Sequence, residues 1–199
     1  MNTKIINQQL LKELNEAVAQ SGEKMEGNLF YLHQQVPENY ELFVPYENKR
    51  KNLAELSTRV NSIIEIGFNA GHSAALMLTA NPNLQLTSVD IGHHSYVTTC
   101  SSIIQSYFPN RHKLILKNSS KLDYHELNSD MVVIDGSHSF SGCFLDLALC
   151  IAYCKSGTIV VIDDWDAPSV RLAFERVSSS FVPYTEIENT ELQGVFYLV

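Results

Sequence analysis

The stretch Ser62-Ile-Ile-Glu-Ile-Gly-Phe-Asn-Ala-Gly-His-Ser73 predicts the first structural unit of the fold. Its three isoleucines are β-branched and apolar, which is typical of a short buried strand. Gly67 ends the strand, Gly71 follows four residues later, and helix-forming residues come next. A strand, a glycine-bounded turn and a helix form the first βα unit of an open α/β sheet. Because such a turn admits a ligand close to the backbone and the helix N-terminus, it predicts a nucleotide-type cofactor site.

The glycine spacing of this turn argues against a dinucleotide. A dinucleotide-binding turn carries Gly-x-Gly-x-x-Gly, whereas the run from Gly67 to Gly71 lacks the middle glycine. Glu65 places a carboxylate inside the strand, where it would repel a pyrophosphate and attract a cationic amino acid or a sulfonium. The alternative is a glycine turn that only packs the helix on the strand.

Composition and charge argue against several classes of protein. With 199 residues, 45% of them hydrophobic and 18% charged, the chain fits one ordinary globular domain. The net charge of -8 argues against nucleic-acid binding, and the only basic cluster, Lys49-Arg50-Lys51, is interpreted as the solvated start of a helix. No apolar stretch is long enough for a secretory signal or a membrane span. Four cysteines without a Cys-x-x-Cys pair predict reduced thiols and a cytoplasmic protein.

Strands and helices alternate along the chain after residue 60. We expect strands at 63–66, 84–89, 112–116, 131–134 and 157–162, and helices at 71–80, 95–107, 139–154 and 168–179. Two last strands, near 184–188 and 195–198, have a short link and should form a hairpin that brings one antiparallel strand into the sheet. The alternation predicts a three-layer, Rossmann-like α/β fold with a mostly parallel seven-stranded sheet.

Residues 1–60 are expected to form an N-terminal helical and aromatic extension, and residues 61–199 the α/β domain. Helices are expected at 4–20 and 49–60 because apolar residues recur there at helical spacing. Residues 23–50 carry many aromatic side chains without a clean period. This stretch is either a lid over the site or a packed extension.

Acidic residues and one histidine follow the ends of the predicted strands. Ligands bind at the carboxyl ends of parallel strands, where this chain places Asp90, Asp135-Gly-Ser-His138 and Asp163-Asp164. Asp90 can accept hydrogen bonds from both hydroxyls of a ribose, or alternatively cap a helix. Carboxylates from neighbouring strands suit Mg²⁺, and a histidine beside them can take a proton from a substrate hydroxyl. The alternative for this group is strand-end caps and a surface histidine.

These motifs, in this order, resemble those of the class I S-adenosylmethionine-dependent methyltransferases. The matching parts are Glu65-x-Gly-x-x-x-Gly71, Asp90, Asp135-Gly-x-His138, and the strand that ends in Asp163-Asp164-Trp165. The Asp-Gly-x-His run is similar to that of a branch of metal-dependent O-methyltransferases acting on natural-product sugars and small hydroxylated molecules. The similarity covers roughly residues 60–199.

The resemblance implies S-adenosylmethionine as cofactor, Mg²⁺ as a candidate second cofactor, and O-methylation of a hydroxyl on a small-molecule acceptor. It implies His138 as the catalytic base, and Asp135, Asp163 and Asp164 as metal ligands. The residues expected at the cofactor are Glu65, Gly67, Phe68, Asn69, Gly71, His72, Ser73, Asp90, Ile91, Ser119, Ser120 and Asp135. A homodimer is left open.

One segment departs from the family pattern. After the third strand the family commonly carries Gly-Asp-Ser, with the Asp near the adenine, whereas this chain has Asn118-Ser119-Ser120. Ser119 can still hydrogen-bond, but the recognition of adenine is left open. The departure keeps a degenerate methyltransferase fold, acting as a binding or effector module, as an alternative. A nucleotide-binding oxidoreductase is the other alternative, disfavoured by the missing glycine and by Glu65.

Overall fold

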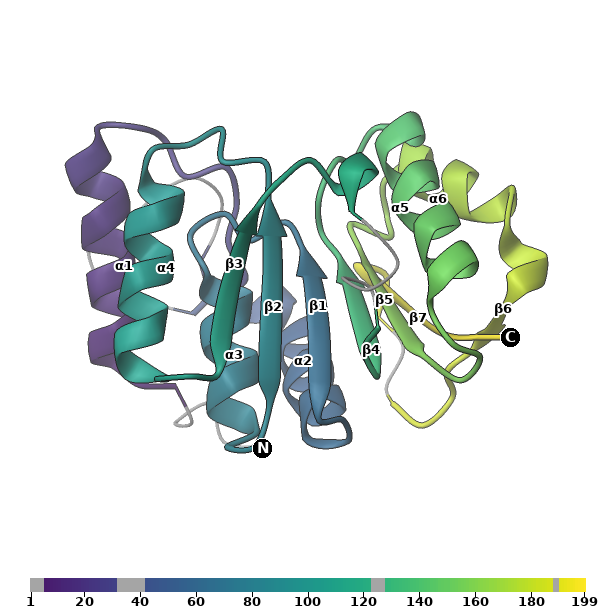
Figure 1. The fold of residues 1–199 in the computed structure, drawn as a ribbon, viewed down its shortest axis with the longest axis horizontal. Helices are drawn as coiled ribbons and strands as arrows, with labels where there is room; N and C mark the ends of the chain where they lie inside the picture. The colour runs from purple at the N-terminus through teal and green to yellow at the C-terminus, as the bar shows by residue number, and fades with distance from the viewer. Residues whose placement is uncertain (1–5, 32–41, 123–127, 188–189) are drawn as a thin grey trace.

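A seven-stranded sheet forms the middle of the computed structural model, with the strand order β3-β2-β1-β4-β5-β7-β6 (Figure 1). The strands are β1 Ser62–Ile66, β2 Gln85–Asp90, β3 His112–Leu116, β4 Met131–Ile134, β5 Ile159–Asp163, β6 Phe181–Pro183 and β7 Gln193–Leu198. Strands β1 to β5 are parallel, and β7 is antiparallel to both of its neighbours. The structure describes residues 6–31, 42–122, 128–187 and 190–199. Part of the aromatic stretch expected at 23–50 therefore lies outside the described residues.

The helices cover both faces of this sheet. They are α1 Gln8–Ser21, α2 Glu47–Thr58, α3 His72–Ala80, α4 Tyr96–Tyr107, α5 Phe140–Tyr153 and α6 Pro168–Glu175. One hydrophobic core contains residues from α1 to α4, and a second contains residues from α5 and α6 (Figure 1). None of these helices, within the part of the chain that the structure describes, is long and apolar enough to cross a membrane.

The inner strands supply alternate residues to the two cores, since successive side chains of a strand point to opposite faces. In β1, Ile63 belongs to the core beneath α1 to α4, whereas Ile64 and Ile66 belong to the core beneath α5 and α6. Both faces of the strand are buried, which explains its near-continuous apolar sequence. The predicted three-layer, mostly parallel fold is thereby confirmed.

Helix α1 of the N-terminal extension packs into the same core as the sheet. Its buried face carries Leu10, Leu11 and Leu14. The Asn7 side chain caps its first turn, and Gly22 ends it in the left-handed conformation. The division into an extension at 1–60 and a domain at 61–199 stays a prediction.

At the end of the chain, the first strand of the hairpin begins earlier than predicted. The penultimate strand is Phe181–Pro183 rather than 184–188, and the preceding helix ends at Glu175 rather than at 179. Phe181 is the aromatic residue that packs on Phe174 and Phe196 in the second core. Glu186 instead forms an ion pair with Arg59 on the other side of the sheet, at 2.7 Å. The alternation of apolar residues alone did not show which of the two segments, 181–183 or 184–188, forms the strand.

Candidate active site

The turn after β1 requires glycine at both of its ends. Gly67 has a φ of 99°, and a Cβ there would lie 1.9 Å from the carbonyl oxygen of Asp135 at the end of β4. Gly71 has a φ of 77°, and a Cβ there would lie 2.6 Å from the ring of Phe68. Only glycine tolerates both the positive φ and the close approach. The turn therefore packs closely against the end of β4, and the opposite side of the turn faces the cleft.

Asp90, at the end of β2, holds this turn. Its Oδ2 accepts hydrogen bonds from the backbone N–H groups of Phe68 at 3.1 Å and Asn69 at 2.9 Å. Its Oδ1 accepts one from the N–H of Gly92 at 2.8 Å. The next helix begins only at Tyr96, so Asp90 is not its N-cap. Oδ2 thus already accepts two hydrogen bonds, whereas Oδ1 accepts one and retains a lone pair for a further donor.

Glu65 lies beneath the turn, away from its open side. The side chain is fully buried, where it accepts hydrogen bonds from the hydroxyls of Ser73 and of Ser88, the latter at 2.6 Å. Burial raises the pKa of Glu65 to about 8, although the two serines oppose the shift. His72 is buried too, bonded to Asn15 at 2.9 Å, and burial lowers its pKa to about 4. Glu65 thus supports the turn from below in this structure.

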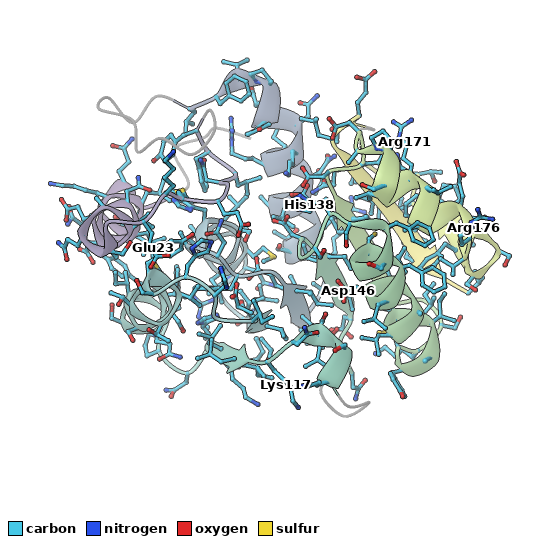
Figure 2. The ribbon with its side chains drawn as sticks, turned by 90° about the horizontal axis from the view of Figure 1, so that it is seen from above. Glu23, Lys117, His138, Asp146, Arg171 and Arg176 are labelled. Atoms are coloured by element: carbon cyan, nitrogen blue, oxygen red, sulfur yellow. The ribbon has the colours of Figure 1, made fainter. Side chains whose placement is uncertain are left out.

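A cleft of about 1050 Å³ opens above the carboxyl ends of β1, β2, β4 and β5. Most of the residues predicted from the sequence line it, namely Gly67, Phe68, Asn69, His72, Ser73, Asp90, Ile91, Ser119, Ser120, Asp135, His138, Asp163 and Asp164. Glu65 and Gly71 lie below this surface. Two residues of the cleft lining, His138 and Asp146, are labelled in Figure 2, which views the molecule from above.

His138 is held between two carboxylates. Its Nε2 lies 2.8 Å from Oδ2 of Asp164 and 3.8 Å from Oδ1 of Asp135. These two carboxylates raise the pKa of His138 to about 10, because both stabilise the protonated ring. The side-chain ligand atoms of the three residues all lie within 4.8 Å of one another. Asp135, His138 and Asp164, which the sequence analysis expected to lie close together, do meet at the ends of adjacent strands.

The position of Lys49 contradicts the interpretation of Lys49-Arg50-Lys51 as the solvated start of a helix. It was expected at a solvated helix start, yet only 11% of its side chain is exposed, and its Nζ lies 2.5 Å from Oδ2 of Asp163. Burial lowers the pKa of Lys49, but the charges of Asp163 and Asp135 outweigh this effect and raise it overall. Arg50 is buried as well, donating to the carbonyls of Leu29 and Phe43. Helix α2 thus directs its first basic residue into the cleft.

The N-terminal segment forms one wall of the cleft. The Asn69 amide of the glycine turn donates to the carbonyl of Gly27 at 2.9 Å and accepts from the Tyr96 hydroxyl at 2.6 Å. Glu23 and His94 are joined at 2.7 Å across the same boundary. This packing agrees with either sequence interpretation of the extension, and a lid movement stays a prediction.

Lys49 and Asp146 are two of the charged cleft residues that the sequence analysis did not predict as site residues. Asp146 lies on α5, is 2% exposed and lines the cleft. A lone acid on an otherwise apolar helix, as in the run Phe140-Ser-Gly-Cys-Phe-Leu-Asp-Leu-Ala-Leu, was the available signal. For Lys49 no local signal distinguished it from its exposed neighbour Lys51.

Comparison with known proteins identifies the class. Residues 64–165, just over half of the chain, match a family described as a methyltransferase domain. The chain belongs to this methyltransferase family, and its fold is the Rossmann-like fold of the class I enzymes. No curated protein matches the chain.

Solved structures share the fold at low sequence identity. A putative caffeoyl-CoA O-methyltransferase from Staphylococcus aureus superposes with a TM-score of 0.66 at 14% identity, covering 100% of this chain and 93% of that one. The O-methyltransferase from Bacillus cereus in complex with SAH gives 0.66 at 12% identity, covering 99% and 94%. A TDP-rhamnose 3'-O-methyltransferase of calicheamicin biosynthesis gives 0.61 at 13%, covering 94% and 93%. At these identities the likeness concerns the fold alone.

Proposed function

We propose that the protein transfers the methyl group of S-adenosylmethionine to a hydroxyl oxygen of a small molecule. One observation carries the proposal. The glycine turn with Asp90 and the histidine at 138 face the same cleft of about 1050 Å³. Ligand pockets of roughly 300–1,000 Å³ enclose drug-sized molecules, so the cleft has room for the cofactor together with a small acceptor.

The charge of the cleft favours this cofactor over a dinucleotide. Six carboxylates line it, those of Glu26, Asp90, Asp135, Asp146, Asp163 and Asp164, against the two lysines Lys49 and Lys117. A surface of one sign concentrates ligands of the opposite sign and repels those of its own. S-adenosylmethionine carries a positive sulfonium and a positive ammonium, whereas a dinucleotide carries a negative pyrophosphate. The same argument weakens the oxidoreductase alternative.

The chain's own residues supply the acid–base part of the reaction. When bound, S-adenosylmethionine supplies a methyl group on a positively charged sulfur. Oδ1 of Asp90, which accepts a single backbone hydrogen bond, would accept another from a ribose hydroxyl. His138 in its neutral form would accept the proton of the acceptor hydroxyl, while Asp164 would keep the ring oriented through the contact at 2.8 Å. The acceptor oxygen gains the methyl group, and the sulfur keeps the bonding electron pair.

The expected Mg²⁺ fits the arrangement of the carboxylates less well than the sequence suggested. Of the three expected ligands, Asp163 is paired with Lys49 at 2.5 Å and Asp164 with His138 at 2.8 Å. A divalent ion would have to compete with both of these cations. Mg²⁺ also prefers a shell of oxygens, whereas the group whose ligand atoms meet includes an imidazole. We therefore propose a site in which Lys49 provides the fixed positive charge.

Calorimetric titration with S-adenosylhomocysteine tests the cofactor. Asp90→Asn is expected to weaken its binding by about 1.5–3 kcal/mol, the contribution of hydrogen bonds to a charged group. The amide keeps one oxygen for the backbone N–H groups of the turn, so thermal unfolding should change little. Unchanged affinity would remove Asp90 from the cofactor site, and binding of NAD in place of S-adenosylhomocysteine would contradict the proposal. Binding without turnover on a panel of sugars and catechols would favour the effector-module alternative.

A further inference from the structure

The ammonium group of Lys49 has hydrogen-bond donors that the protein itself does not use. The side chain lines the cleft and is 11% exposed. Among the described residues, Asp163 is the one acceptor of a hydrogen bond from its Nζ, at 2.5 Å. An ammonium carries three N–H donors, so two of them stay available. Because the residue lines the cleft, a group bound in the cleft can accept from them.

Lys49 and His138 lie around the same three carboxylates. Asp163 and Asp164 stand at the end of β5, and Asp135 directly follows β4, the neighbouring strand. Lys49 pairs with Asp163, whereas Nε2 of His138 lies 2.8 Å from Asp164 and 3.8 Å from Asp135. The charges of all three carboxylates raise the pKa of Lys49, so all three lie near its ammonium. An acceptor oxygen bound at His138 therefore lies close to the ammonium as well.

These carboxylates make a positive charge necessary beside the acceptor oxygen. When the hydroxyl loses its proton, negative charge develops on the oxygen, and nearby carboxylates oppose it. A cation already fixed in the site stabilises such a charge without reorganisation. Mg²⁺ would have to displace Lys49 from Asp163 to take this role. Lys49 is thus the cation that this part of the cleft already contains.

The surroundings of Lys49 favour a flat, apolar acceptor. Tyr46 lines the cleft, and the centroid of its ring lies 5.4 Å from Nζ of Lys49. Leu29 and Leu53 line the cleft too. An aromatic ring packs well on aromatic and aliphatic side chains of this kind. An aromatic hydroxyl also ionises more readily than an alcohol, with a pKa of ~10 in tyrosine.

We propose that Lys49 binds the acceptor oxygen directly, in the role expected of Mg²⁺, and that the acceptor is an aromatic hydroxyl held as its anion. The inference rests on the proposed function, since it assumes methyl transfer in this cleft. The O–H bond of the acceptor breaks, its proton passes to Nε2 of His138, and the oxygen keeps the electron pair. Lys49 stabilises this oxygen until it bonds to the methyl carbon, and Asp163 positions the ammonium.

The test uses 4-nitrophenol bound to the complex with S-adenosylhomocysteine, because its anion absorbs visible light and its neutral form does not. At the pH at which free 4-nitrophenol is half ionised, and with EDTA present, the wild type should bind it mainly as the anion. Lys49→Met is made in the Asp163→Asn background, where removal of the whole ion pair should leave the protein folded. Relative to Asp163→Asn alone, the ratio of bound anion to bound neutral form should fall at least about tenfold, since a nearby cation shifts a pKa by about one unit or more.

Lys51→Met is the matched control, because it removes the same charge from the same helix at an exposed pair with Glu47. It should leave the ratio unchanged. Equal ratios with and without Lys49 would overturn the inference. A wild type that holds the anion only after addition of Mg²⁺ would overturn it too, as would one that binds S-adenosylhomocysteine but not 4-nitrophenol, and neither result depends on a variant. If calorimetry shows no binding of S-adenosylhomocysteine, the proposed function itself fails, which is a different result.

Discussion

Replacing His138 by alanine is expected to reduce the rate of methyl transfer by about 10²–10⁴-fold, the usual contribution of a positioned general base. The ring lies 2.8 Å from Asp164 at the mouth of the cleft and 54% of its side chain is exposed, so its removal leaves the core intact. Affinity for S-adenosylhomocysteine should stay within about twofold, because the ring is placed at the acceptor rather than at the ribose. Transfer of labelled methyl to an acceptor that the wild type uses measures the first quantity, and calorimetry the second.

The pH dependence of the reaction distinguishes a base from a structural histidine. Only the neutral ring accepts a proton, and Asp135 and Asp164 raise the pKa of His138 to about 10. In the wild type, kcat/KM should therefore rise with pH from neutrality towards about 10. Asp164→Asn removes the nearer carboxylate, which lowers this pKa and moves the rise to lower pH. Identical pH profiles for the two proteins, or a profile that His138→Ala leaves unchanged, would contradict the assignment.

The parts of the site that the sequence predicted are those set by local rules. Gly67 and Gly71 could be recognised because the end of β1 and the start of α3 both leave a pattern in a few neighbouring residues. Asp90, Asp135 and Asp163 could be placed together because parallel strands bring their carboxyl ends to one edge of the sheet. Nothing beyond strand periodicity was needed for that step.

The parts that escaped prediction depend on packing between distant segments. Lys49 and Asp163 are 114 residues apart, and only the docking of α2 brings them together. On α5 the apolar residues Phe140 and Phe144 remain 38% and 37% exposed. The buried face of this helix carries Asp146 beside Cys143 and Leu147. Sequence spacing gives the faces of a helix, but a helix with apolar residues all round does not reveal which face is buried.

Replacing Lys49 by methionine is expected to lower the free energy of unfolding by about 3–5 kcal/mol, the cost of leaving one partner of a buried ion pair alone. Methionine keeps the length of the side chain, so the change removes mainly the charge beside Asp163, of whose side chain 9% is exposed. Urea unfolding measures the difference. Lys51→Met is the control on the same helix, because its pair with Glu47 is 40% and 42% exposed and contributes about 0–1 kcal/mol.

A second substitution shows whether the loss comes from the unpaired charge. Asp163→Asn in the Lys49→Met background removes the charge that was left alone, so it should restore most of the lost stability. Mg²⁺ provides the complementary test. In Lys49→Met the carboxylates of Asp135, Asp163 and Asp164 lack this cation. If Lys49 holds the place of a metal, Mg²⁺ should therefore raise the melting temperature of Lys49→Met and leave that of the wild type unchanged. Equal stabilisation of both proteins by Mg²⁺ would show that the ion and Lys49 do not compete, and the metal-assisted reaction expected from the sequence would then be the better account.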